Sequence, residues 1–268
     1  MKYFKIIFFL IWINLSVSYG ADLQKGLDAA RSGDFSTALK EWRPLAENGE
    51  VIPQYMLGQM YIYGHGVAQD TNEAIKWFRL AAEQGDISSQ STLGYIFTNG
   101  DSGIQDEEEA VKWYRLAAEQ GDISSQSTLG YIYTNGDNSI RDDEEAVKWY
   151  RLAAEQGDAL SQNNLGLKYA NGKGVTQDYK LAVKLFSYSA KQGHMDAQTS
   201  LGYMYENGHG VDQSMVFAYM WYNLAAAQGQ KTAKNNTMIV VKKMSVAEIE
   251  EAQKLAKKCI GNNYEGCQ

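Results

Sequence analysis

The sequence is poor in the residues that build metal sites, and its charge is weighted toward acid. Its 268 residues include three His and two Cys, and 32 acidic side chains outnumber 25 basic ones, for a formal net charge of −7. Phosphate binding needs clustered cations, so no nucleic-acid partner is expected. With so few His and Cys we predict no metal site and no cofactor. The 44% hydrophobic content excludes wholesale disorder.

Residues 1–20 follow the pattern of a secretory signal peptide. Lys2 and Lys5 precede an apolar run, and small residues lead up to a cut between Gly20 and Ala21. The run is about ten residues long, whereas a spanning helix needs roughly 20, so we expect cleavage and no membrane span afterwards. A membrane anchor is the alternative. The prediction is a periplasmic or secreted protein.

A 36-residue repeat runs through the remainder of the chain. The Leu-Gly pair recurs with this period at Leu57-Gly58, Leu93-Gly94, Leu129-Gly130, Leu165-Gly166 and Leu201-Gly202. One aromatic position reads Trp77, Trp113, Trp149, Leu185 and Trp221. The predicted units are an N-terminal degenerate capping repeat at 21–48, repeats at 49–84, 85–120, 121–156, 157–192 and 193–228, and C-terminal capping helices at 229–268.

Each unit is predicted to be a pair of helices, A and B, which makes the fold all-α. Helix A begins after the boundary Gly, and a Gly-rich turn ends it. Helix B begins at an aspartate such as Asp70, Asp106 or Asp142, whose side chain can accept from free backbone amides. Because one hairpin cannot bury its own apolar face, successive units must stack. Residues 231–243 place a Lys-rich segment where a further helix A would stand, and Ser245 opens a last helix.

The motif Gln-x-x-Leu-Gly-x-x-Tyr-x-x-Gly-x-Gly-Val-x-x-Asp-x-x-x-Ala-x-x-Trp-x-x-x-Ala-Ala-x-x-Gly stands in full between Gln54 and Gly85. It resembles the Sel1-like repeat, a relative of the tetratricopeptide repeat, and the resemblance covers about residues 22–260. It implies a right-handed α-solenoid that acts as an adaptor for proteins or peptides, and bacterial members are often periplasmic or secreted. The second and third repeats lack Gly-x-Gly-Val, so a different turn geometry is expected there.

The helix-A face opposite the Leu-Gly pair is the predicted partner-binding surface. Tyr supplies amphipathic contact area at low entropic cost, so a Tyr row flanked by small polar groups suits a peptide groove on the concave side. The alternative is an ordinary wet surface. The predicted contact residues are Tyr55, Gln59, Ser91, Tyr95, Thr98, Ser127, Tyr131, Thr134, Asn163 and Tyr203.

Other conspicuous residues are given structural roles. The Trp positions are interpreted as core packing. The acidic runs that begin at Asp106 and Asp142 fall in the first turn of helix B, where the helix dipole favours negative charge. His65 and His209 share one position in the Gly-rich turn and are interpreted as solvated loop residues.

The two cysteines lie eight residues apart, near the C-terminal end of the sequence. In an oxidising compartment a disulfide between Cys259 and Cys267 is the simplest interpretation, and it would close the C-terminal tail. Free thiols or an intermolecular bond are the alternatives. A cysteine-rich branch of the resembled family is linked to β-lactam hydrolysis and carries a disulfide in each repeat. None of the repeats here contains a Cys.

No nucleophile or metalloprotease motif is present in the sequence. We therefore predict a scaffold that binds an unidentified protein or peptide and is not an enzyme. The rivals are a cell-wall enzyme or accessory and a purely structural protein that oligomerises through its ends. The oligomeric state is left open.

Overall fold

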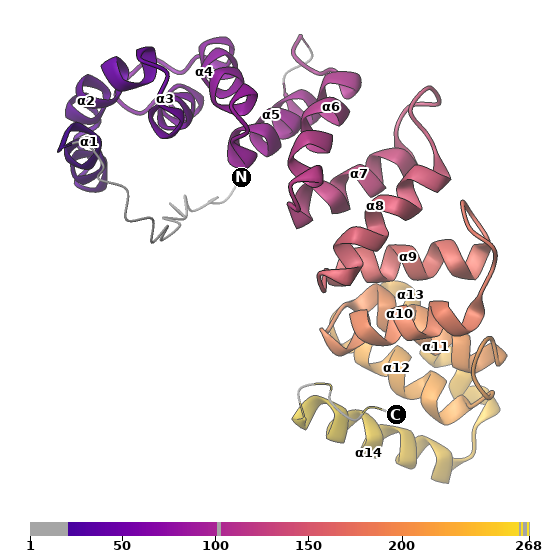
Figure 1. Ribbon diagram of the computed structural model, residues 1–268. Coiled ribbons are helices and arrows are strands. Elements are labelled where there is room, and N and C mark those ends of the chain that lie inside the picture. The colour runs from indigo at the N-terminus through magenta and orange to yellow at the C-terminus, as the bar shows by residue number, and fades with distance from the viewer. Residues whose placement is uncertain (1–20, 101–102, 263, 265–266, 268) are drawn as a thin grey trace. The chain divides into compact units, whose positions relative to one another are not determined.

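The structure is a computed structural model that describes residues 21–100, 103–262, 264 and 267 (Figure 1). The predicted signal peptide lies outside these residues. Within them the regular structure is helical, with no strand. The helices are α1 (Ala21–Arg31), α2 (Phe35–Glu47), α3 (Val51–Tyr63), α4 (Thr71–Glu83), α5 (Ile87–Asn99), α6 (Glu107–Glu119), α7 (Ile123–Asn135), α8 (Asp143–Glu155), α9 (Ala159–Asn171), α10 (Tyr179–Lys191), α11 (Met195–Asn207), α12 (Met215–Ala227), α13 (Lys231–Val240), η1 (Val241–Lys243) and α14 (Val246–Gly261).

The chain divides into two compact units, one ending at Gln84 and the other beginning at Gly85. The first unit holds α1 to α4 and the second holds α5 to α14. Within each unit every helix from α1 to α13 packs against the next one in sequence. This arrangement confirms the predicted all-α repeat fold of helix pairs.

The glycine of each Leu-Gly pair brings helix A onto an aromatic ring of helix B. A Cβ added to Gly130 would lie 2.5 Å from the ring of Tyr150, and one added to Gly166 would lie 2.7 Å from Phe186. Only glycine leaves room for the ring at that distance. The same contact recurs between Gly58 and Phe78, Gly94 and Tyr114, and Gly202 and Tyr222.

A glutamine pair joins helices A and B within each repeat. In the third repeat Gln126 is buried, and its Nε2 donates to the backbone oxygen of Ala118 at 3.0 Å. Its Oε1 accepts from Gln156 Nε2 at 2.8 Å. The buried amide is thereby satisfied on both sides, as a polar core group must be. The equivalent pairs are Gln54–Gln84, Gln90–Gln120, Gln162–Gln192 and Gln198–Gln228.

Capping aspartates begin the B helices, as predicted. Asp70 and Asp106 accept from the amide three residues further on at 3.0 Å each, and Asp142 does the same at 3.1 Å. The following acidic residues fall in the first turn of α6 and α8, which confirms their predicted placement. Charge of this sign is favourable at a helix N-terminus.

The turns between helices A and B differ between repeats, as expected from the missing Gly-x-Gly-Val. Gly64, Gly172 and Gly208 end their helices in the left-handed conformation, with φ of 68°, 67° and 69°. Gly100 and Gly136 occupy the same place with extended backbone, at φ of −64° and −63°. The helix pairing is the same in both groups.

The C-terminal segment of the second unit is helical throughout. The Lys-rich residues 231–243, expected to replace a helix A, are themselves helical: Lys231–Val240 form the short helix α13, which packs on α12, and Val241–Lys243 form η1. Ser245 and Glu248 form the predicted capping box at the start of α14, which also packs on α12. No helix in the described part of the chain combines the length and apolarity that crossing a membrane requires.

Candidate functional site

Three tyrosines of the predicted surface stand exposed at equivalent positions on helices of the second unit. Tyr95 on α5, Tyr131 on α7 and Tyr203 on α11 are 62%, 60% and 50% exposed. Each directly follows the glycine that packs on a helix-B ring, so its own side chain leaves the helix away from that contact. We call these three residues the tyrosine column; Leu167 on α9 holds the intervening position and is also exposed.

The tyrosine column has little structural role of its own. The hydroxyls of Tyr95 and Tyr131 form no hydrogen bond within the described residues, and Tyr203 makes only an edge contact with His209, at 5.8 Å between ring centroids. Buried tyrosines usually find a hydrogen-bond partner, whereas these phenols are turned toward solvent. They are therefore available to another molecule.

The small polar residues near the tyrosine column are mostly engaged inside the fold. Thr98 and Thr134 each donate to the backbone oxygen four residues earlier at 2.8 Å, and Ser91 donates to Ser88 at 3.1 Å. Ser127 accepts from Ser161 on α9 at 2.9 Å and donates to Asp158. Their hydroxyls hold helices in place and offer little to a partner.

Asn163 is placed wrongly by the sequence prediction. Only 4% of it is exposed, because α9 turns this residue toward its helical neighbours. A residue so covered cannot contact a partner on the open surface.

Tyr55 and Gln59 belong to α3 of the first unit and are both half-buried. The ring of Tyr55 lies 5.8 Å from that of Phe78, in a tilted arrangement. These two residues are therefore described apart from the tyrosine column of the second unit.

An asparagine stands four residues after each tyrosine of the tyrosine column and after Leu167. The sequence analysis did not single out these asparagines. The side-chain amide of Asn99 donates to the backbone oxygen of Tyr95, and that of Asn135 does the same to Tyr131, both at 3.2 Å. Asn171 and Asn207 repeat the bond at 2.8 and 2.9 Å. The 36-residue spacing of these asparagines was the available signal. They are exposed, so tyrosine and amide stand side by side on one helix face.

The histidines of the Gly-rich turn are not free loop residues. His65 stacks on Phe35 with ring centroids 4.4 Å apart, and His209 stacks on Tyr179 at 4.6 Å. Both side chains are half-buried, and Nδ1 of His209 is buried with no hydrogen-bond partner among the residues that the structure describes. The expectation of solvated positions is corrected: each ring fastens its turn to the start of an earlier helix.

The tryptophan rings are core elements, as interpreted from their spacing. Trp113, Trp149 and Trp221 are buried, and Trp77 is half-buried. Burial raises the pKa of the neighbouring core tyrosines Tyr114 and Tyr150 to about 12. Phenols so shifted are poor acids at neutral pH, and they pack here against glycines.

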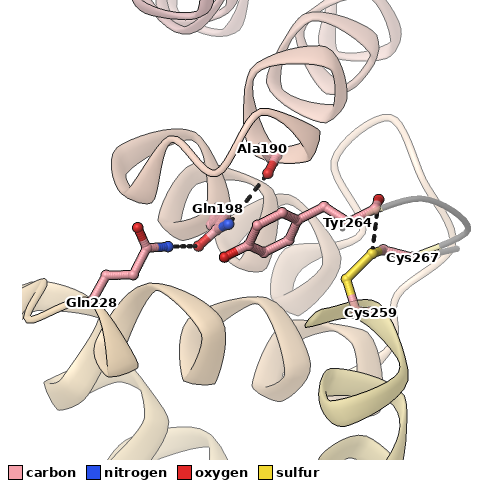
Figure 2. The surroundings of a disulfide bond; sticks show 6 residues. All are labelled: Ala190, Gln198, Gln228, Cys259, Tyr264 and Cys267. Atoms are coloured by element: carbon pink, nitrogen blue, oxygen red, sulfur yellow. Dashed lines mark hydrogen bonds between the residues drawn. A yellow bond between two sulfur atoms is a disulfide. The ribbon is translucent and has the colours of Figure 1, made fainter. Parts of the chain in front are cut away.

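The C-terminal tail is tied back by a disulfide between Cys259 on α14 and Cys267, whose Cα atoms are 5.1 Å apart. Figure 2 shows the ring of Tyr264, inside this loop, turned toward the Gln198–Gln228 pair. The same ring lies beside Gly193 in the turn before α11. The ring of Tyr264 therefore lies against the start of the last full repeat.

Among the residues that the structure describes, no group of three His, Cys, Asp or Glu side chains is placed to hold a metal ion. The acidic side chains that gather at the starts of α6 and α8 are occupied as caps and first-turn residues.

Comparison with known proteins agrees with the repeat pattern. The Sel1 repeat family model matches residues 54–86, 87–122, 123–158, 159–194 and 196–230. No curated protein matches the chain. A Sel1 repeat protein from Oxalobacter formigenes is similar in structure, with 28% identity and a TM-score of 0.67 over 87% of this chain and 97% of that one.

A second similar structure is c5321, described as a protective antigen present in uropathogenic Escherichia coli strains that displays an SLR fold. It is 27% identical, with a TM-score of 0.55 over 92% of this chain. The match spans 62% of the length of c5321. The family model covers more than half of the chain in five consecutive copies, and the chain therefore belongs to the Sel1 repeat family.

Proposed function

We propose that this chain is an exported, non-catalytic scaffold that binds a protein or peptide partner through the tyrosine column, Tyr95, Tyr131 and Tyr203. The observation that carries the proposal is that the three tyrosines occupy the same position of their repeats and are each at least 50% exposed. Tyrosine buries a large amphipathic area at the cost of few rotatable bonds, and it is enriched in interfaces for that reason.

The family supports the general part of this proposal. Sel1 repeat proteins generally mediate protein–protein interaction, and the repeat is typically a non-catalytic scaffold. The partner class follows from the exposed row: a segment long enough to touch several helices, with apolar and hydrogen-bonding groups that meet phenol and amide side chains. Asn99 and Asn135 would add carbonyl oxygens to each tyrosine contact.

Export is supported by the leader pattern of residues 1–20 and by the disulfide. A Cys259–Cys267 bond persists in an oxidising compartment and is rare in the cytosol. Mass spectrometry of the chain recovered from its native host should give a mature N-terminus at Ala21. A chain that retains Met1 and is confined to the cytoplasm would overturn this part.

The binding surface is tested by replacing the tyrosine column. The triple variant Tyr95→Ala/Tyr131→Ala/Tyr203→Ala should lose at least about tenfold in the capture of partners by chemical crosslinking from host extracts, because interface aromatics carry much of the binding energy. Helicity by circular dichroism should be unchanged, since exposed side chains cost little on removal.

A matched control removes a different exposed row on the B helices. Leu80→Ala/Leu116→Ala/Leu152→Ala deletes three side chains that are 44%, 38% and 38% exposed and 36 residues apart. This variant should capture the same partners as the unmodified chain. Equal loss in both triple variants, or full capture by the tyrosine variant, would show that the site lies elsewhere.

A further inference from the structure

The fourth repeat lacks two side chains, a Glu and a Trp, that the first three repeats share; the fifth repeat keeps only the Trp, as Trp221. Where the third repeat has Glu145 and Trp149, four residues apart on α8, the fourth has Leu181 and Leu185 on α10. Both replacements are shorter than the residues they replace, and neither carries a polar atom. Compared with the third repeat, the fourth therefore lacks an indole ring and a carboxylate.

In the third repeat these two groups fill the space beside α6. The indole Nε1 of Trp149 donates to Glu145 at 3.0 Å, and Lys148 lies over the indole at 5.1 Å. Glu145 also reaches Arg115 on α6, with 3.9 Å between oxygen and nitrogen. Trp149 is 2% exposed. The site is closed by the repeat's own side chains.

In the fourth repeat the equivalent place is an open cavity of about 520 Å³ between α8, α9 and α10. We call it the fourth-repeat cavity. Its apolar wall includes Ala154, Leu165, Leu181 and Leu185, and Arg151 and Lys184 stand at its edge. Cavities of this size hold small molecules or large side chains.

The wall of the cavity is slightly more exposed than the matching residues one repeat earlier. Ala154 is 8% exposed, whereas its counterpart 36 residues earlier, Ala118, is 1% exposed. Leu185 itself is 9% exposed. Covering the small apolar area that is still exposed here with an apolar group would be favourable.

The basic residues around the cavity lack the carboxylate that Glu145 supplies in the third repeat. Arg151 keeps the bond to a tyrosine hydroxyl, Tyr169, at 3.0 Å, just as Arg115 keeps Tyr133. Within the described residues, however, Arg151 forms no ion pair. Lys184 lies 5.8 Å from the ring of Tyr188 at the edge of the cavity. Glu155 is the one acidic residue of the lining, so cations predominate.

We propose that the fourth-repeat cavity binds an aromatic side chain accompanied by a carboxylate, supplied by a partner protein. The ring would lie against Leu165, Leu181 and Leu185, near the Lys184 ammonium, as the indole of Trp149 lies near Lys148. The carboxylate would pair with Arg151, whose planar guanidinium suits it. A helix with an acidic residue four positions before an aromatic one presents both groups, as α8 does in the third repeat. This site is distinct from the tyrosine column.

The minimal probe is N-acetyltryptophan, which carries an indole and a carboxylate, compared with its neutral amide. In an NMR titration of the isotope-labelled chain, the acid should saturate and shift the amide signals of Leu181 and Leu185. It should bind about tenfold more tightly than the amide, because a charge-assisted pair is lost in the amide. Equal affinities, or shifts that do not saturate, would overturn the proposal.

Two variants separate the ring site from the charge. Leu185→Trp restores the residue of the neighbouring repeats and should abolish saturable binding. Arg151→Gln leaves the cavity open and should remove the preference for acid over amide, so it tests the proposal even if the first variant fails to fold. The matched control is Arg115→Gln in the filled third repeat, which should leave both affinities unchanged. An equal effect of Arg115→Gln and Arg151→Gln would contradict the assignment.

Discussion

The third and fourth repeats are built on one frame and differ in what fills it. Both have a glycine against a helix-B ring, Gly130 in one and Gly166 in the other, and both have the paired glutamines. They differ at the tryptophan position. Trp149 is buried there in the third repeat, whereas Leu185 lines a cavity in the fourth. The difference shows that backbone approach and amide pairing hold the hairpin, whereas the indole position can change.

The largest expected effect comes from making the third repeat resemble the fourth. Trp149→Leu removes a buried ring from a filled site, and we expect the free energy of unfolding to fall by about 2–4 kcal/mol. The loss is measured by urea denaturation followed by circular dichroism.

The reverse change, Leu185→Trp, fills an existing cavity and serves as the control for ring size. It should leave stability unchanged or raise it by up to about 1 kcal/mol. If Leu185→Trp lowered the free energy of unfolding as much as Trp149→Leu does, the fourth repeat would have no room for an indole ring.

A smaller effect distinguishes the two repeats at high pH. Burial raises the pKa of Tyr150 to about 12, and the fourth repeat has Phe186 in its place. The unfolded chain loses this proton near pH 10, so the stabilisation is complete below pH 10 and is lost as pH rises toward 12. Titration of Tyr150 should therefore lower the free energy of unfolding by about 1.4 kcal/mol at pH 11 relative to pH 8.

Tyr150→Phe isolates that contribution. The difference in unfolding free energy between this variant and the unmodified chain should be constant below pH 9 and should shift by about 1.4 kcal/mol in favour of the variant at pH 11. Parallel curves from pH 8 to pH 11 would show that the Tyr150 hydroxyl titrates alike in the folded and unfolded chain.

The repeat period and the composition predicted the helix pairs and their ends, because these features depend on residues close together in the sequence. Capping aspartates, the Leu-Gly pairs and the capping box at Ser245 are short-range patterns, and each is found in place. The different turn at Gly100 and Gly136 was also foreseen, from the residues that replace Gly-x-Gly-Val.

The remaining features depend on distances between helices, which a periodic pattern does not contain. The burial of Asn163 follows from how α9 sits among its neighbours, and the stacking of His209 on Tyr179 joins residues 30 positions apart. Leu185 was recognised as the exception to the tryptophan row. That it leaves a cavity depends on whether α8, α9 and α10 close over the missing ring, which side-chain spacing cannot decide.

A double substitution that opens a second cavity in the third repeat tests whether the missing Glu and Trp side chains create the binding site. Glu145→Leu/Trp149→Leu gives the third repeat the two residues of the fourth, with Arg115 beside the new space as Arg151 is beside the old one. If absent side chains define the binding place, N-acetyltryptophan should occupy one site on the unmodified chain and two on the double variant, with the second set of NMR shifts around residues 145 and 149. A folded double variant that still binds one molecule, at the fourth repeat, would contradict the account.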